Sequence, residues 1–329
     1  MNFSGYSDKF LHIINDEIKK ILPNNSYPNL YDAMLYAFDT GGKRLRPILC
    51  LAACDSLGGD FEDALPFAVA IEIAHNALLV HDDIEDGDAV RRGKPSIWAK
   101  YGIPHSTNIG DGMYFKAYES LFKSKLPAQK IVELSKIFTD MLAKVVEGQN
   151  MELNFRTRSD VTAEEYEEMV WKKSGTLITA SLVGAATIAE APEQSIKILK
   201  EYGRKIGIAF QIKDDILNLV GEQEKYGKEI GGDIKEGKRT LVTIHCLSRC
   251  DNDEKKKLLE ILKKSREAVT KDDAIVAMKL IKKYGSIDFA KKYSYELIEG
   301  AKQLLSKIDN MELKCILEEF ADFMVNREY

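Results

Sequence analysis

Apolar residues recur at intervals of three and four along most of the chain, which is the spacing of one face of an α-helix. The pattern is regular over residues 8–22, and it starts again near Leu30 and runs towards Phe38. No stretch of useful length alternates between apolar and polar residues as a half-buried strand does. The pattern therefore predicts an all-α protein. Further helices are expected at residues 48–57, 64–81, 108–122, 131–154, 177–189, 196–219 and 294–327.

Some of the expected helices are apolar nearly all round, which indicates burial. They are residues 48–57, 64–81 and 177–189. None of these stretches reaches the 18 or more apolar residues that a membrane span needs, so no span is predicted. The segments 93–105 and 222–240 contain several glycines and are expected to be loops, the second of them closing over a substrate. The highly charged residues 251–273 are expected to form peripheral helices.

The second buried helix leads into a cluster of carboxylates. Asp82 and Asp86 are four residues apart and share a helical face, with Asp83 beside them. Carboxylates one turn apart repel each other unless a cation lies between them, and Mg²⁺ often combines one or two carboxylates with substrate phosphates. Arg91 and Arg92 follow within a few residues. The stretch therefore predicts a metal site next to a phosphate site, although a solvated acidic helix end is the alternative for this motif taken alone.

A second carboxylate pair makes the solvated alternative less suitable. Asp214 and Asp215 lie in Phe210–Asn218 among apolar neighbours, and the basic residues Lys228 and Lys238 follow in a glycine-rich segment. Each half of the chain thus offers carboxylates followed by cations. Two such sites, facing each other across a cavity, would hold one polyphosphate through several Mg²⁺ ions.

A glycine pair with basic residues forms a third candidate site. Gly41 and Gly42 allow close backbone approach to a ligand, and Lys43 and Arg46 lie at the start of the next helix. Cations at a helix start oppose the macrodipole unless an anion binds there. A surface turn with basic side chains is the alternative. For His75, on a buried helix, the alternative to ligand binding is a hydrogen-bonded core residue.

Composition and charge limit the classes of function. The chain has 329 residues, 45% hydrophobic and 30% charged, and a net charge of −5, so no nucleic-acid partner is expected. The N-terminus has acidic residues and no long apolar core, so it resembles neither a signal peptide nor a transit peptide. The five cysteines lack the usual zinc-site spacing and are expected to be free thiols in a reducing compartment. The protein is therefore expected in the cytoplasm.

These motifs together resemble the trans-isoprenyl diphosphate synthases, the family of head-to-tail prenyltransferases. The matching residues run in the family's order through roughly residues 30–245. They are Gly41–Pro47, Asp82–Ser96, Gly148–Gln149, Lys172–Gly175, Phe210–Asn218 and Gly227–Thr240. The resemblance implies one polyprenyl synthase domain over residues 1–329, built as an isoprenoid synthase helical bundle around a central cavity. It also implies a homodimer. One departure is Asn218, where much of the family has Asp.

The resemblance also assigns roles to individual residues. The metal ligands would be Asp82, Asp83, Asp86, Asp214 and Asp215, holding three Mg²⁺ per active site. The allylic diphosphate (dimethylallyl, geranyl or farnesyl) would be bound by Arg91, Lys173, Lys228 and Lys238. Isopentenyl diphosphate would be bound by Lys43, Arg46, His75 and Arg92. Ser174 and Gln211 would present oxygen dipoles to the allylic cation, and together with Lys173 they form the expected catalytic set.

Product length is expected to depend on the helix that leads into Asp82. Leu78 and Ala77 lie four and five residues before it, about 6 and 7.5 Å below it along a helix. In the family, bulky residues at these depths stop chain growth. Ala77 is small and Leu78 is of medium size, so geranylgeranyl diphosphate is the expected product, with farnesyl or a longer polyprenyl diphosphate as the alternative. The alternative is that Ala77 faces a neighbouring helix. Met113 or Tyr114 would then form the floor of the cavity, the side chains that stop chain growth.

Three other functions fit parts of the pattern. A terpene cyclase also uses an aspartate-rich motif with Mg²⁺, but it has no isopentenyl diphosphate site, so Lys43, Arg46 and Arg92 count against it. A non-catalytic synthase subunit would carry eroded motifs, and only Asn218 points that way. A helical binding protein would show no Mg²⁺-dependent turnover.

Overall fold

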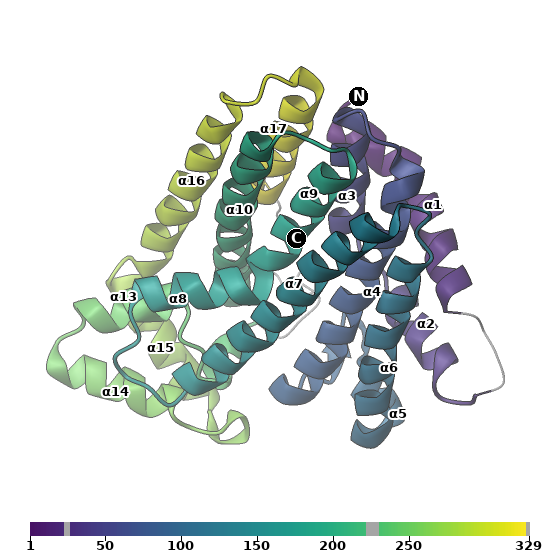
Figure 1. Ribbon diagram of the computed structural model, residues 1–329. Coiled ribbons are helices and arrows are strands. Elements are labelled where there is room, and N and C mark those ends of the chain that lie inside the picture. The colour runs from purple at the N-terminus through teal and green to yellow at the C-terminus, as the bar shows by residue number, and fades with distance from the viewer. Residues whose placement is uncertain (23–26, 222–229, 327–329) are drawn as a thin grey trace. The chain divides into compact units, whose positions relative to one another are not determined.

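The computed structural model describes residues 1–22, 27–221 and 230–326 (Figure 1). Helices form most of it, which confirms the all-α prediction. In these ranges the only strands are β1 (Val90–Arg91) and β2 (Lys94–Pro95), which pair antiparallel. The sequence did not predict this hairpin because two-residue strands are too short to show an alternating pattern.

Residue contacts divide the chain into two compact units. The first contains Met1–Leu142, Leu177–Gly203 and Leu304–Phe320, and the second contains Ala143–Thr176, Arg204–Gln303 and Ala321–Tyr329. Helices α7 (Ala128–Phe155), α10 (Glu193–Val220), α16 (Ser286–Leu305) and α17 (Met311–Asn326) contribute residues to both units. The expected single domain around a central cavity stays a prediction.

The first unit is organised around one long apolar helix. Its remaining elements are α1 (Phe3–Ile21), α2 (Tyr31–Asp39), α3 (Leu45–Ser56), α4 (Phe61–Asp86), α5 (Ile97–Tyr101), α6 (Ile103–Phe122) and nearly all of α9 (Thr176–Ile188). Helix α4 packs against α1, α3 and α6. Asp60 caps its start by accepting the Glu62 N–H at 2.8 Å, and Gly87, at φ 68°, ends it directly after Asp86. All three aspartates of the first motif therefore belong to this helix.

Helix α4 is long and apolar enough to cross a membrane by length and composition, the single such helix in the described residues. However, 67% of its most apolar window is buried inside the structure. It also carries Glu72, which is 3% exposed. We therefore interpret α4 as a core helix.

The second unit has its own core. Its further elements are α8 (Ala163–Val170), η1 (Trp171–Gly175), α12 (Gly232–Lys235), α13 (Leu241–Arg249), α14 (Asn252–Leu262), η2 (Arg266–Ala268) and α15 (Lys271–Lys283). The core includes Tyr166 of α8 and Ile212 of α10. The charged helices α14 and α15 each bury one apolar face in this core, through residues such as Leu258 and Ile281.

Element η1 is a single turn of π-helix, which holds about one residue more than an α-helical turn. Two glycines lie against it. A Cβ on Gly148 of α7 would lie 2.4 Å from the backbone nitrogen of Lys173. A Cβ on Gly207 of α10 would lie 2.2 Å from Cα of Gly175. Only glycine permits these approaches, so α7 and α10 hold the wide turn between them.

Three boundaries differ from the prediction. The expected loop 93–105 contains α5 and the first turn of α6, and residues 232–235 of the expected loop 222–240 are helical. The expected helix 294–327 is two helices, α16 and α17. The apolar period continues across this break, but Asn310 caps α17 by accepting the Leu313 N–H at 2.8 Å. A capping residue inside a periodic pattern is a weak sequence signal.

Candidate active site

The glycine pair between α2 and α3 forms a turn that Arg44 fastens to the first unit's core. Gly41 and Gly42 have φ values of 104° and 125°, as the prediction of a helix break requires. The buried Arg44 guanidinium donates to the carbonyls of Phe38 (2.9 Å) and Gly41 (3.1 Å). It also donates to Glu72 of α4 at 3.3 Å. Arg44 thus has a structural role.

The two basic residues on either side of Arg44 are placed differently. Lys43 is exposed on the turn. Nη1 of Arg46 lies 3.2 Å from Nε2 of His75 on α4. Burial, and then the charges of Arg46 and other nearby arginines, hold the pKa of His75 well below its usual value. The imidazole is therefore neutral, and its Nε2 accepts the hydrogen bond from Arg46.

The first aspartate cluster lies in the last turn of α4. Carboxylates at a helix C-terminus oppose the macrodipole, so they require cations nearby. Nε of Arg91 donates to Asp83 at 2.7 Å, and Nη2 of Arg91 lies 3.7 Å from Asp82. Burial lowers the pKa of Arg91, but the charge of Asp83 and then of Asp82 outweigh burial and raise it. Asp83 therefore contacts an arginine, while Asp86 is buried at 5% exposure.

Arg92 belongs to the turn of the β1–β2 hairpin. Its guanidinium donates through Nη1 to the Gly41 carbonyl of the glycine turn. Burial lowers the pKa of Arg92 to about 10; Glu72 acts against this shift, and the charges of Arg44, Arg91 and Arg46 add to it. Several guanidinium groups thus gather close together. Such an arrangement favours an added anion.

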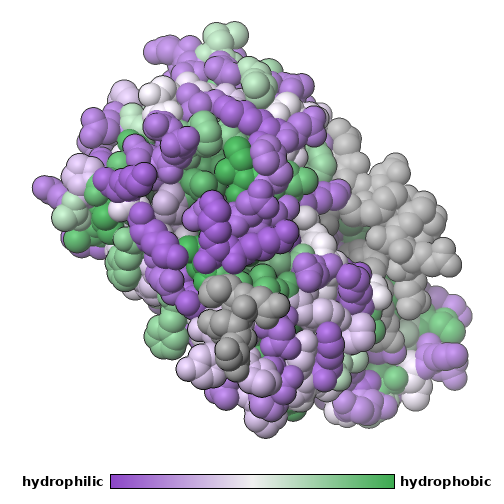
Figure 2. All heavy atoms as spheres, turned by 90° about the vertical axis from the view of Figure 1, so that its right-hand side faces the viewer, coloured by the Kyte–Doolittle hydropathy of each residue, from purple (hydrophilic) through white to green (hydrophobic). Residues whose placement is uncertain are grey.

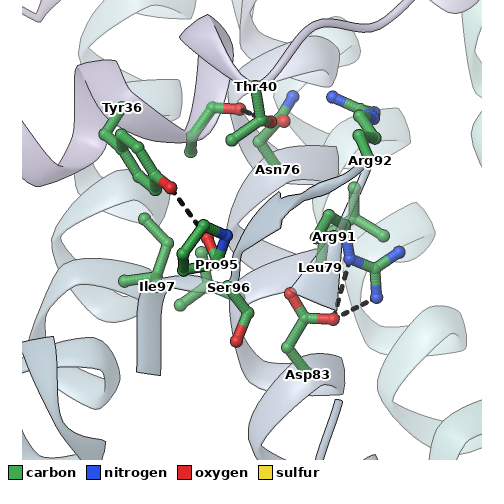
Figure 3. Close-up of a pocket in the computed structure, with 12 residues that line it drawn as sticks. Tyr36, Thr40, Asn76, Leu79, Asp83, Arg91, Arg92, Pro95, Ser96 and Ile97 are labelled. Carbon is green, nitrogen blue, oxygen red and sulfur yellow. Dashed lines mark hydrogen bonds and ion pairs between the residues drawn. The ribbon is translucent and has the colours of Figure 1, made fainter. Parts of the chain in front are cut away.

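A pocket lies under this hairpin in the first unit (Figure 3). Tyr36 stands on one side of it, and Arg91 and Arg92 stand on the other. Its lining comes from α2, α4, the hairpin and α5, namely Tyr36, Ala37, Thr40, Asn76, Leu79, Val80, Asp83, Arg91, Arg92, Pro95, Ser96 and Ile97. The hairpin therefore connects the glycine turn to the aspartate-rich end of α4.

In the second unit, the π-helix presents the expected catalytic residues. Nζ of Lys173 donates to both carboxylate oxygens of Glu152, each at 3.1 Å. Nζ of Lys238 lies 4.0 Å from Glu152 and 2.7 Å from Glu236. Lys173 and Lys238, both predicted to bind the allylic diphosphate, thus converge on Glu152, which is 8% exposed.

A chain of hydrogen bonds connects the π-helix to α10. The Ser174 hydroxyl donates to Oε1 of Gln211 at 2.8 Å, and Nε2 of Gln211 donates to Asp215 at 3.0 Å. The buried Tyr166 hydroxyl donates to the other oxygen of Asp215 at 2.6 Å. Burial, and then the charge of Asp233, raise the pKa of Asp215. Both oxygens of Asp215 accept hydrogen bonds from protein groups, whereas its neighbour Asp214 is half-buried.

The oxygen ligands of the first cluster fit Mg²⁺. Among the described residues, no group of three or more acidic, histidine or cysteine side chains surrounds a common point. A metal bound entirely by protein would require such a group. Mg²⁺ usually takes one or two carboxylates and fills its shell with water and substrate phosphates. Asp82 and Asp86, one helical turn apart, match that mode of binding.

The remaining predicted residues are placed as follows. Lys228 lies outside the described residues. Ala77 is fully buried, and one turn later on α4 the ring of His81 lies 5.7 Å from that of Tyr114 on α6. Leu78 is partly exposed. By helical stepping, Leu78 lies closer than Ala77 to the face that carries Asp82.

The structure brings the predicted residues together within each unit. Arg46 meets His75, Arg91 meets Asp82 and Asp83, and Ser174 meets Gln211. The face-to-face arrangement of the two aspartate motifs stays a prediction. Sequence reasoning missed the roles of Glu72 and Tyr166. For Glu72 a signal existed, because a carboxylate inside an apolar helix is costly without a partner.

Comparison with known proteins gives a consistent result. The family model described as polyprenyl synthetase matches residues 27–279. A short chain isoprenyl diphosphate synthase of Methanocaldococcus jannaschii is 40% identical over 324 residues, covering 98% of this chain and 96% of that protein.

Solved structures agree. The crystal structure of a geranylgeranyl pyrophosphate synthetase from Pyrococcus horikoshii has a TM-score of 0.90 and 36% identity, covering 99% of this chain and 98% of that chain. A polyprenyl synthase from Caulobacter crescentus, complexed with calcium and isoprenyl diphosphate, has a TM-score of 0.88 and 27% identity, with 99% and 98% coverage. These likenesses confirm the isoprenoid synthase fold.

Proposed function

The chain belongs to the polyprenyl synthetase family, and from this we propose that it condenses isopentenyl diphosphate head to tail with an allylic diphosphate. Geranylgeranyl diphosphate is the proposed main product. The observation that carries the proposal is the gathering of Arg46, Arg91 and Arg92 around neutral His75 beside the aspartates of α4. Crowded guanidinium groups next to carboxylates suit a substrate that brings a diphosphate and a metal together.

Isopentenyl diphosphate would bind at the glycine turn. Lys43, Arg46 and Arg92 supply its cations, and His75 orients the guanidinium of Arg46 by accepting its hydrogen bond. Because His75 is neutral, it does not repel the guanidinium of Arg46, which stays in place to bind the diphosphate. Fixed cations of this kind hold the substrate's double bond in place for attack.

The allylic diphosphate would bind at the aspartates. Asp82, Asp86 and Asp214 would hold Mg²⁺, which would supply the positive charge that makes diphosphate a better leaving group. Arg91, Lys173 and Lys238 place positive charge where the leaving group's negative charge develops. Glu152, which holds Lys173, keeps that ammonium in position before the substrate arrives.

Ser174 and Gln211 would stabilise the allylic cation without attacking it. Because the Ser174 hydroxyl donates a hydrogen bond to Gln211, the oxygen lone pairs of Ser174 stay available to face positive charge. The carbon–oxygen bond to diphosphate breaks, and the double bond of isopentenyl diphosphate forms the new carbon–carbon bond. A proton is then lost, and the released diphosphate takes it.

We propose a homodimer formed through α6 and the start of α7. Phe115 and Phe122 are 75% and 61% exposed on α6, and Val132 of α7 is 53% exposed. Tyr118 of α6 lies between the two phenylalanines and reaches α7 through Thr139 at 2.7 Å. A second copy would cover this apolar stripe. On the side of the molecule drawn in Figure 2, hydrophilic residues cover most of the surface, with hydrophobic patches between them.

The experiment incubates the purified chain with labelled isopentenyl diphosphate and each of the dimethylallyl, geranyl and farnesyl diphosphates, with Mg²⁺ or with a chelator. Products are separated by chromatography. We expect chelator-sensitive formation of geranylgeranyl diphosphate. A hydrocarbon formed from geranylgeranyl diphosphate alone would instead indicate a cyclase.

Light scattering of wild type and Phe115→Glu tests the dimer, and we expect the variant to be monomeric. The proposed cytoplasmic location is checked by cell fractionation.

A further inference from the structure

The hairpin that carries Arg91 and Arg92 is too short to hold its own shape. It consists of two strands of two residues joined by a turn at Arg92 and Gly93, whose φ values are 52° and 74°. Isolated two-stranded hairpins are marginally stable at best in water. The position of both arginines must therefore be set by what the hairpin contacts.

Two contacts besides those of the arginines attach the hairpin to α2. The Tyr36 hydroxyl donates to the Pro95 carbonyl at 2.9 Å (Figure 3). Nζ of Lys94 donates to the Asp39 carbonyl at 2.8 Å. Since α2 runs directly into the glycine turn, these contacts fix the hairpin relative to Gly41 and to the exposed Lys43.

The side chain of Tyr36 is itself held in place. Nζ of Lys100 lies 3.8 Å from the centre of its ring, and the ring of Tyr101 lies 6.3 Å away at a near-perpendicular angle. Both residues belong to α5, which follows the hairpin. A ring packed in this way directs its hydroxyl at Pro95 at little further entropic cost.

We propose that Tyr36 is a positioning residue for isopentenyl diphosphate, which it serves by holding the hairpin so that Arg92 faces the glycine turn. This inference rests on the proposed function. The Arg92 guanidinium now donates to Gly41, and a diphosphate arriving at the turn competes for it. Arg92 can turn to the substrate without releasing the hairpin, because Tyr36 and Lys94 keep the hairpin attached. Arg91 keeps its own contacts with Asp83 and Asp82 on α4. The effect should therefore fall on the substrate that uses Arg92.

The test compares Tyr36→Phe with Tyr101→Phe. Tyr101 packs in the same ring cluster, and its hydroxyl has no hydrogen-bond partner within the part of the chain that is described. Kd for isopentenyl diphosphate is measured by calorimetry, and KM for each substrate and kcat by turnover. Loss of one hydrogen bond predicts ~3–10-fold weaker binding of isopentenyl diphosphate for Tyr36→Phe. For Tyr36→Phe, we expect KM for the allylic substrate and kcat to stay within about twofold of wild type. For Tyr101→Phe, we expect Kd, KM and kcat all to stay within that range.

A double-mutant cycle shows whether the effect passes through Arg92. In an Arg92→Ala background, Tyr36→Phe should have little further effect on Kd, because the group that it positions is gone. Unchanged Kd in Tyr36→Phe, equal weakening of both substrates, or full additivity with Arg92→Ala would each overturn the inference. Any of these results, with wild-type turnover intact, leaves the proposed function standing. A wild type that neither binds nor consumes isopentenyl diphosphate overturns both.

Discussion

The side-chain carbonyl of Asn218 on α10 accepts the backbone N–H of Asp233 at 3.1 Å. The backbone carbonyl of Asn218 also accepts the N–H of Gly231 at 2.7 Å. Asn218, which is 4% exposed, therefore anchors the start of α12, at the position where much of the family has Asp. Its role in this chain follows from its acceptor oxygen, which Asp also has.

This role predicts different effects for two substitutions of Asn218. Asn218→Asp keeps the acceptor, so we expect an unchanged product, a modest shift in the Mg²⁺ optimum and kcat within about threefold of wild type. Asn218→Ala leaves the Asp233 N–H without this partner, which should destabilise the protein by about 1–3 kcal/mol. Product chromatography and thermal unfolding measure both. A large rise in rate for Asn218→Asp would mean that the wild-type chain is a weakened enzyme.

Loss of a metal ligand should abolish turnover without unfolding the chain. Asp82→Ala and Asp214→Ala are each expected to lower kcat by about three orders of magnitude or more, because the leaving group loses its metal contact. Their Tm should change little, because Asp82 lies 3.7 Å from Arg91, which keeps its contact with Asp83, and Asp214 is half-buried. Glu133→Ala, at an exposed carboxylate of α7, is the matched control. Near-normal turnover of Asp214→Ala would show that the second metal site is misassigned.

His75 predicts a pH dependence of stability. Its pKa in the folded protein lies well below the usual value because of burial and then the nearby arginines, so the unfolded chain binds a proton that the folded chain does not. The free energy of unfolding should therefore fall as pH drops below about 6.5 and level off above it, with a slope of at most about 1.4 kcal/mol per pH unit.

Substitution of His75 isolates this contribution. His75→Gln keeps an acceptor for Arg46 but removes the titration, so its Tm should fall less than that of wild type between pH 7.5 and pH 5.5. His12→Gln, at an exposed histidine of α1, serves as the control. Parallel Tm curves for wild type and His75→Gln would contradict the assignment of a neutral imidazole in the folded state.

Substitutions on α4 should change product length. Leu78→Ala removes a partly exposed side chain on the side of Asp82, so we expect longer products by chromatography. Ala77→Phe should shorten the product to farnesyl diphosphate. Ala77 is fully buried, so this added ring should also cost about 1–3 kcal/mol in overpacking. If neither substitution shifts the products, the floor lies elsewhere, for example at Met113 or Tyr114.

How far the sequence could predict the site depends on the range of each interaction. Asp82 and Asp86 were found because their spacing is a property of one helix. The structural role of Arg44, which sets it apart from the basic residues beside it, could not be predicted, because it depends on Glu72, 28 residues away. Likewise Asp214 and Asp215 look equivalent in sequence. Tyr166, 49 residues before Asp215, is what engages one of them and not the other.

The fold was predicted more completely than the site for a related reason. A helical period is repeated many times along the chain, so one unusual residue does not hide it. The β1–β2 hairpin has no such repetition, and it forms because side chains outside it, such as Tyr36 and Asp83, hold it in place. Both predicted arginines nevertheless lie on it.

The π-helix makes one stretch of the chain sensitive to its length. The turn Trp171–Gly175 holds one residue more than an α-helical turn would, so deleting a residue there would restore a regular helix. Everything after the deletion would then rotate by about 100°, and Ser174 would point away from Gln211. Conservative replacements of individual side chains in this turn are therefore easier to accommodate than a change in residue number. A protein of this fold that retains the π-helical turn must therefore also retain the number of residues in it.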